Sequence, residues 1–288
     1  MAIISNILFP VDFSRFSRGM AAYVKRAASL FGARVSLIHV IDPSNINGLE
    51  TIDRSPFDVE EEHLDAGREK LTAFCTSEFP LSQVPRVLAL GDPATEIAKT
   101  ARRGQFDLII MPTHAGIFRR MLLGSTTAKV LDSAPCPVLT SMHSEAVTPH
   151  PIEHREWVCA IGLSSQSERV LRYAKSAAEE VQGKLSIVHA VQAIERNRHV
   201  RLDLEEKIES AERQEARRRI DELQKAVGLD VPVRIAVGAV KDALLEAARQ
   251  SDADALIIGR DHRAGAKGLL RDLTYAVVRD SPFPVLSV

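Results

Sequence analysis

The sequence contains two copies of one pattern, and this internal repeat constrains the fold more than any other feature. The segment SLIHV at Ser36–Val40 recurs as SIVHA at Ser186–Ala190, 150 residues later. APCPVLTS, which begins at Ala134, recurs as SPFPVLSV, which begins at Ser281, 147 residues later. Nearly constant shifts between separate segments indicate a duplicated domain. We therefore expect two domains of the same fold.

Within each copy, apolar runs typical of buried parallel strands alternate with segments of helical spacing. The first copy predicts strands over residues 3–11, 34–41, 84–90, 108–111 and 138–140, with helices over 14–32, 59–79, 93–103 and from 125. The second predicts strands over 157–161, 185–191, 231–237, 255–259 and 285–288, with helices over 166–181, 198–227, 242–250 and 272–280. This alternation is typical of an α/β fold with doubly wound parallel five-stranded sheets, for which we expect the strand order 3-2-1-4-5.

A polar segment with two prolines, Ser144–Glu156, interrupts the alternation between the copies. We expect a first domain over residues 1–141, a linker over 142–155 and a second domain over 156–288. Three histidines, His143, His150 and His154, cluster in and beside the linker. No cysteine or acidic residue stands near them at ligand spacing, so solvated histidines are favoured over a metal site.

Composition excludes several classes of partner. The formal net charge of −1 gives no electrostatic reason to bind nucleic acid or an anionic membrane. No apolar run approaches the length of a membrane span, and the N-terminus is typical of a first strand and not of a signal peptide. The three cysteines are odd in number and lack metal-ligand spacing, so we expect buried, reduced thiols and a cytoplasmic protein.

The candidate site lies where strands one and four end. Ligands of doubly wound sheets bind at the carboxyl ends of the strands, where the strand order reverses. Pro10-Val11-Asp12 and Met111-Pro112-Thr113 stand at these ends, and Val40 borders the same crevice. A carboxylate at Asp12 can accept hydrogen bonds from a ribose hydroxyl or a nucleobase amine. On its own, Asp12 is about as well explained as a helix-capping residue.

A possible phosphate site follows the fourth strand. Gly124-Ser125 opens the next helix, with Thr126 and Thr127 in its first turn. Backbone N–H groups and hydroxyls at a helix start point at an anion, and the helix dipole favours it. Many α/β turns carry a glycine and a serine with no ligand, so this signal alone is weak.

Several motifs together resemble a universal stress protein domain. They are P-V-D-F-S after the first strand, G-D-P-A-T-E-I before the third helix, and P-T-H…L-L-G-S…A-P-C-P-V around the fourth. The second half resembles a weaker copy, with AIGLSSQSERVLRYAKSA, VGAVKDALLEAA, LIIGRDHRAG and SPFPVLSV. The chain is thus similar to a tandem universal stress protein. This implies a Rossmann-like fold of the adenine nucleotide alpha hydrolase-like type and a non-enzymatic role in the stress response.

The resemblance also implies an adenine nucleotide, ATP with or without Mg²⁺, as a ligand of the first domain only. Nucleotide-binding members have Gly, two residues, Gly, nine residues, then Gly-Ser or Gly-Thr. Here Pro112 and Ala115 replace the two glycines, and the loop is one residue shorter. By this resemblance, Asp12 contacts the ribose or adenine, and Val40 and Met111 line the base. The residues implied to surround the phosphates are Ala115, Gly116, Gly124, Ser125 and Thr126. The implied site is Pro10, Val11, Asp12, Val40, Met111, Pro112, Thr113, Ala115, Gly116, Gly124, Ser125, Thr126 and Thr127.

The second copy departs further from the motif. Gly162 stands in the place of Asp12, and Arg271-Asp272 replaces Gly124-Ser125. An aspartate at a helix start caps the helix and repels phosphate. Gly259 keeps the first motif glycine, but His262 replaces the second. We expect an empty or altered site and a structural or regulatory domain.

Two other functions stay open. A weak ATP hydrolase is disfavoured because the chain has no Lys-Ser/Thr phosphate loop and no dense carboxylate cluster for Mg²⁺. His39 and His189 lie within strands, His114 is the histidine nearest the crevice, and Arg119 and Arg120 are expected to be solvated. A nucleotide-free interaction or scaffold module is the other alternative.

The last strand of each domain is expected at a sheet edge, which invites pairing with another strand. Universal stress proteins resemble one another in dimerising through this strand. The resemblance therefore implies an intramolecular pseudo-dimer, and a homodimer of the tandem chain is compatible with it.

Overall fold

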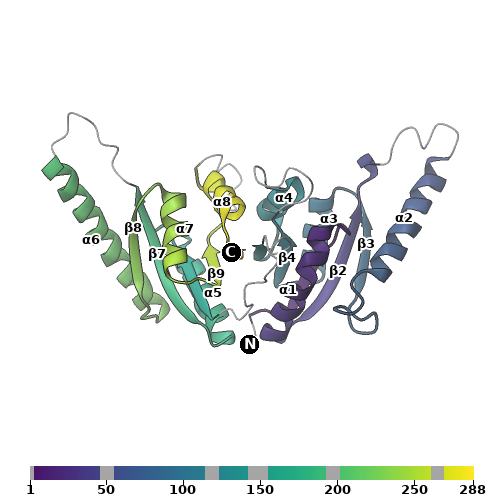
Figure 1. Cartoon of the computed structure of the whole chain (residues 1–288), viewed down its shortest axis with the longest axis horizontal. Coiled ribbons are helices and arrows are strands. Elements are labelled where there is room, and N and C mark those ends of the chain that lie inside the picture. Colours follow the sequence, from purple (N-terminus) through teal and green to yellow (C-terminus); the bar gives the residue numbers. More distant parts are fainter. Residues whose placement is uncertain (1–2, 46–54, 114–122, 142–154, 193–201, 261–268) are drawn as a thin grey trace. The chain divides into compact units, whose positions relative to one another are not determined.

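The computed structural model describes residues 3–45, 55–113, 123–141, 155–192, 202–260 and 269–288. The chain divides into two compact units, Met1–Ile152 (unit 1) and Glu153–Val288 (unit 2), each with its own sheet strands and helices (Figure 1). The expected linker, residues 142–155, lies almost wholly outside the described residues, together with His143, His150 and His154.

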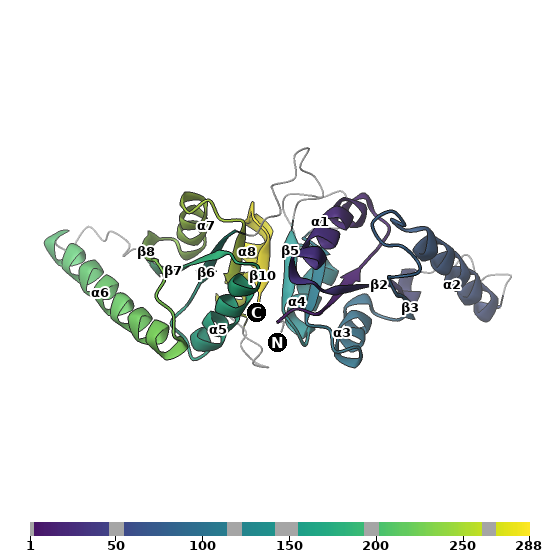
Figure 2. The same ribbon diagram turned by 90° about the horizontal axis from the view of Figure 1, so that it is seen from below.

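Unit 1 is a parallel sheet with helices on both faces. Its strands are β1 (Asn6–Pro10), β2 (Arg34–Ile41), β3 (Arg86–Leu90), β4 (Leu108–Pro112) and β5 (Val138–Ser141), in the order β3-β2-β1-β4-β5. Its helices are α1 (Arg15–Phe31), α2 (Pro56–Ala73), α3 (Pro93–Arg103) and α4 (Ser125–Ser133), with a short 3-10 turn at Pro43–Asn45. Helix α1 lies on one face of the sheet and α3 and α4 lie on the other (Figure 2).

Unit 2 repeats this arrangement. Its strands are β6 (Glu156–Ala160), β7 (Lys184–Gln192), β8 (Val233–Gly238), β9 (Ala255–Ile258) and β10 (Val285–Ser287), in the order β10-β9-β6-β7-β8, and all of these pairs are parallel. Its helices are α5 (Ser167–Glu180), α6 (Leu202–Val227), α7 (Val240–Gln250) and α8 (Leu269–Asp280). The predicted doubly wound α/β fold class is therefore confirmed.

Local chemistry explains where α1 begins and ends. The Ser14 hydroxyl accepts a hydrogen bond from the Ser17 backbone N–H, which caps the helix N-terminus. Gly32 ends the helix in the left-handed conformation, at φ 61°, and its N–H returns to carbonyls of the last turn. Between these residues an apolar stripe that includes Met20 and Val24 is fully buried against the sheet.

Matching aspartates tie the first strand of each unit to the fourth. In unit 1 the Asp107 carboxylate accepts the backbone N–H groups of Ser5 and Asn6, both at 2.9 Å. In unit 2 the Asp254 carboxylate accepts those of Arg155 and Glu156, at 2.8 and 3.0 Å. The repeat therefore extends from the sequence to individual hydrogen bonds.

Helix α2 ends earlier than the sequence predicts. The helix expected over residues 59–79 spans Pro56–Ala73, and the chain turns to extended backbone at Phe74. The Arg86 guanidinium, from β3, donates to the carbonyls of Leu71, Phe74 and Phe79. These bonds satisfy carbonyls that a longer helix would have paired internally.

Among the described residues, none of the helices combines the length and the apolar character that a membrane span requires.

Candidate functional site

Asp12 lies immediately beyond β1 and is held by α1. Its Oδ1 atom accepts hydrogen bonds from the Ser14 backbone N–H, at 3.0 Å, and from the Ser17 hydroxyl. The Ser17 oxygen in turn accepts from the Asp12 N–H at 3.2 Å. Because Ser14 supplies the cap of α1, the Asp12 carboxylate is not needed for that role. It is exposed, and its remaining lone pairs can accept hydrogen bonds from a ligand.

A histidine fixes the turn that presents Asp12. His39 Nδ1 lies 2.8 Å from the Val11 carbonyl oxygen, and the Val11 N–H donates to Ile38 at 2.8 Å. A carbonyl only accepts, so Nδ1 carries the proton. The Phe13 ring covers His39, with ring centroids 4.2 Å apart, and burial lowers the pKa of His39. The His39 side chain thus positions the turn at Val11, a role that its place within a strand does not predict.

Hydrogen bonds join the end of β4 to the start of α4. The Gly124 N–H donates to the Thr113 carbonyl at 3.2 Å, and the buried Thr127 hydroxyl donates to the Pro112 carbonyl at 3.1 Å. Thr113 is buried, and its own N–H donates to Ser141 of β5 at 3.1 Å. Thr127 therefore positions the helix, and its hydroxyl is already engaged.

The first turn of α4 is suited to an anion. Gly124 is the N-cap residue, no side chain among the described residues makes a capping hydrogen bond, and the first turn contains no acidic residue. By contrast, the hydroxyl of Ser14 caps α1 and the carboxylate of Asp92 caps α3. The exposed Ser125 and half-buried Thr126 add hydroxyls beside the backbone N–H groups of this turn.

The two parts of the site meet at one edge of the sheet. Strand β1 pairs in parallel with β4, with Ile7 opposite Leu108, so both strands end toward the same edge. Val40, in β2, is half-buried, and Met111, in β4, is buried. The predicted phosphate residues Ala115 and Gly116 lie outside the described residues, and so do His114, Arg119 and Arg120.

An ion pair fixes α4 against α3. Lys129 Nζ lies 2.9 Å from the Asp92 carboxylate. This lysine, together with the hydroxyl and N–H of Thr95, lowers the pKa of Asp92 to about 2. The Asp92 carboxylate is thus occupied by Lys129 and by Thr95 at the N-terminus of α3.

The comparison with known proteins agrees with the repeat. The model of the universal stress protein family matches residues 4–141 and again residues 155–288. The chain belongs to the universal stress protein family. A universal stress protein of Thermus aquaticus is 34% identical over 138 residues, which are 46% of this chain and 96% of that protein. One from Methanocaldococcus jannaschii is 33% identical over 138 residues, 46% of this chain and 79% of that protein.

Solved structures show the fold over the full length. The crystal structure of a universal stress protein from Archaeoglobus fulgidus aligns with a TM-score of 0.65. It is 21% identical, and the alignment covers 98% of this chain and 95% of that one. The two universal stress protein domains thus have a counterpart with both domains in one chain.

The second universal stress protein domain keeps the turn but not the acid. His189 Nδ1 lies 2.8 Å from the Ile161 carbonyl oxygen, as His39 does from Val11 in unit 1. Gly162 follows in the place of Asp12. His262 and Lys267 lie outside the described residues. The contact between histidine and carbonyl is therefore the same in both units, whereas the residue after the carbonyl changes from Asp12 to Gly162.

Ser17, whose hydroxyl donates to the Asp12 carboxylate, was not among the predicted site residues. The signal was available as a serine five residues after the acid, one helical turn beyond the cap. Within the described residues, no three or more His, Cys, Asp or Glu side chains converge as they would around a metal ion. Cys136 and Cys159 are buried, and Cys75 is half-buried.

Proposed function

We propose that this universal stress protein binds ATP in unit 1 and acts in the stress response without catalysing a reaction on the nucleotide. One observation carries the proposal. The uncapped N-terminus of α4 and the exposed, oriented carboxylate of Asp12 follow adjacent parallel strands, β4 and β1. N–H donors for an anion and a carboxylate acceptor for hydroxyl groups, both at the carboxyl ends of these strands, match the two polar ends of a nucleotide.

Each group has a defined part in this proposal. The Asp12 carboxylate accepts from the ribose hydroxyls or the adenine amine, and Val40 and Met111 flank the base. The N–H groups at Ser125 and Thr126, with the Ser125 hydroxyl, bind phosphate oxygens. Ala115 and Gly116, which lie outside the described residues, stay predicted phosphate contacts on the family motif alone. Mg²⁺ would be held by the phosphate oxygens of the nucleotide.

A double variant tests the site. Asp12→Ala removes the acceptor, and Ser125→Asp places a negative charge at the helix start, where it repels phosphate. ATP affinity, measured by isothermal titration calorimetry, is expected to fall about a hundredfold or more. The matched control is Asp65→Ala with Ser133→Asp, which makes the same changes at an exposed acid and at the other end of α4. Unchanged ATP affinity in the test variant would place the site elsewhere.

Nucleotide analysis of the purified protein separates the alternatives. Bound ATP that stays intact supports the proposal, whereas ADP formed with turnover supports a weak hydrolase. No bound nucleotide, and no thermal shift on adding ATP, would support an interaction module. The buried or half-buried thiols also lead us to propose a cytosolic setting. Pairing of the last strands, within one chain or between two, stays a prediction that light scattering can test for the homodimer.

A further inference from the structure

Unit 2 contains a cavity at the carboxyl ends of β6 and β9. Its volume is about 390 Å³, which lies within the range of pockets that take small molecules. The sheet and the helices α5, α7 and α8 contribute its walls, which are largely aliphatic. The principal apolar residues are Ile161, Val170, Val240, Leu244, Ile258 and Val277.

A buried hydroxyl without a partner lines this cavity. Ser167 is only 2% exposed, and its Oγ atom has no hydrogen-bond partner among the described residues. Its counterpart in unit 1, Ser17, donates to the Asp12 carboxylate. In unit 2 that acceptor is missing because Gly162 stands in its place. A buried donor left without an acceptor is costly, so a ligand that supplies one gains affinity.

The space beside Gly162 can receive that acceptor. A Cβ atom built on Gly162 would meet no heavy atom within 4 Å. Among the described residues, a side chain at position 162 therefore has space at its first carbon, and Ser167 is the counterpart of the serine that bonds Asp12 in unit 1. Helix α5 starts beside this space: the Ser164 hydroxyl accepts from the Gln166 N–H at 3.3 Å, and among the described residues the N-cap residue Gln166 makes no capping hydrogen bond of its own.

The charges around the cavity favour an anionic acceptor. Arg260, 5% exposed, lines the cavity, and its backbone N–H is fixed to the Val288 carbonyl at 2.7 Å. The nearest acid on α5, Glu168, is already paired with Arg172, at 2.6 and 3.0 Å. The positive end of the α5 dipole lies beside Ser167 and stabilises negative charge there.

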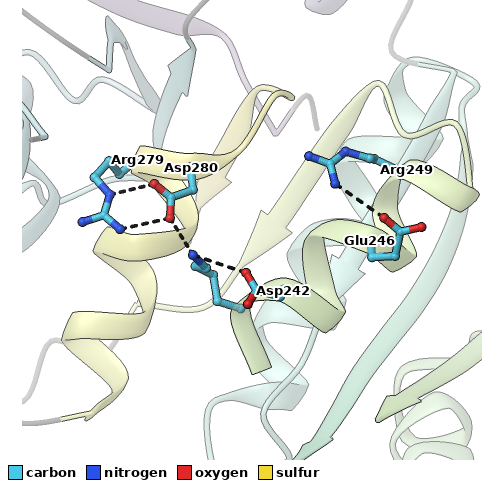
Figure 3. A network of polar contacts seen from close by, with 6 residues as sticks. Asp242, Glu246, Arg249, Arg279 and Asp280 are labelled. Atoms are coloured by element: carbon cyan, nitrogen blue, oxygen red, sulfur yellow. Dashed lines mark hydrogen bonds and ion pairs between the residues drawn. The ribbon is translucent and has the colours of Figure 1, made fainter. Parts of the chain in front are cut away.

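An ion-pair network holds two of the walls together. The Asp280 carboxylate of α8 lies 2.7 Å from Lys241 Nζ of α7 and is also bonded by Arg279 (Figure 3). Lys241 precedes the wall residue Leu244 by one helical turn, and Asp280 follows Val277 by three residues. The ion pair thus links the two helices that carry Leu244 and Val277.

We propose that unit 2 binds a small aliphatic carboxylate. The carboxylate accepts from the Ser167 hydroxyl in the space beside Gly162, and the hydrocarbon chain lies along the apolar walls. An adenine nucleotide is disfavoured there, because no acid stands at position 162 to accept from its ribose. This proposal does not depend on ATP binding in unit 1.

Calorimetric titration of the whole chain with octanoate tests the ligand class. Octanoate is expected to bind with saturation at one site. Octanol, which has the same chain with a neutral head group, is expected to bind about tenfold more weakly or worse, and octylammonium is expected not to bind. Absence of saturable octanoate binding, or equal affinity for octanol, would overturn the proposal.

Substitutions test the location. Gly162→Asp supplies the missing acceptor and a repelling charge, so octanoate binding should be lost while thermal stability is kept or raised. Ser167→Ala, which needs no new space, should weaken octanoate about tenfold. Ser176→Ala, an exposed serine of the same helix, should change nothing. Unchanged affinity in Ser167→Ala would refute the assigned contact.

The variant Asp12→Ala with Ser125→Asp separates this proposal from the one for unit 1. It should keep full octanoate affinity whether or not unit 1 binds ATP. Loss of octanoate binding in that variant would place the fatty acid in unit 1 and overturn the assignment. Displacement of octanoate by ATP in the variant would show that the unit 2 cavity takes a nucleotide, and would overturn the assigned ligand class.

Discussion

At the residue scale, the His39 side chain links a titratable ring to the backbone turn that presents Asp12. Its Nδ1–H donates to the Val11 carbonyl, one residue before Asp12. Burial lowers the pKa of His39 from 6.5, while the hydrogen bond to Val11 and the charge of Asp12 raise it. The native protein therefore favours the neutral ring.

The lowered pKa sets the direction of a pH effect. His39 contributes full stability above pH 6.5, its ordinary value, and that contribution is lost as the pH falls through the lowered value. Asp12→Asn should lower the pKa of His39 further, because it removes the carboxylate charge. Titration of the His39 ring by NMR checks both statements, with Asp65→Asn as the control. A His39 pKa at or above 6.5 in the parent protein would contradict the predicted pH effect. An unchanged His39 pKa in Asp12→Asn would contradict the assigned influence of the carboxylate.

At the element scale, both units tie their third helix to their fourth, but with different residues. Unit 1 uses Lys129 of α4 and Asp92 at the start of α3. Unit 2 uses Lys241 of α7 and Asp280 of α8 (Figure 3). In unit 1 the acid belongs to the third helix and the lysine to the fourth. In unit 2 the lysine belongs to the third helix and the acid to the fourth, so both units link these helices but with the charges exchanged.

Asp280→Asn tests the contribution of this link. Arg279 and Lys241 hold the pKa of Asp280 well below its usual range, so the carboxylate stabilises the fold above about pH 4 and this is lost as the pH falls. The variant should lose roughly 1 kcal/mol near pH 7, with a smaller difference in acid, since the pair is partly solvated. Urea denaturation at several pH values measures this. Glu246→Gln, which removes one exposed partner of Arg249, should cost less.

At the scale of the whole molecule, the repeat made most of the fold predictable. Buried parallel strands are continuous apolar runs, so their places could be read from the sequence. The end of α2 could not, because it depends on Arg86 reaching back from another element. The serine five residues after Asp12 is visible in the sequence, but the hydrogen bond that it makes to Asp12, and the loss of that bond at Ser167, could not be read from it. Both depend on how a helix start meets a strand end, which residue types alone do not determine.

The divergence of the two units leads to a further expectation. Arg271→Gly with Asp272→Ser restores the Gly-Ser of the phosphate motif in unit 2. It should not create ATP binding stronger than about millimolar, because Gly162 still offers no carboxylate to the ribose. Calorimetry in the Asp12→Ala, Ser125→Asp background isolates unit 2. Tight ATP binding there would show that the acid at position 12 is dispensable.

The turn after the first strand has a consequence for protein engineering. Phe13 and Leu163 both adopt positive φ values, 62° and 52°, although neither is glycine. Such backbone costs about 1–3 kcal/mol and persists only where its surroundings hold it. Both units hold the same backbone turn, and among the described residues a Cβ atom at position 162 meets no heavy atom within 4 Å, so small side chains can be introduced there without changing the turn. A single chain would then yield a series of receptors with the same geometry and different chemical selectivity.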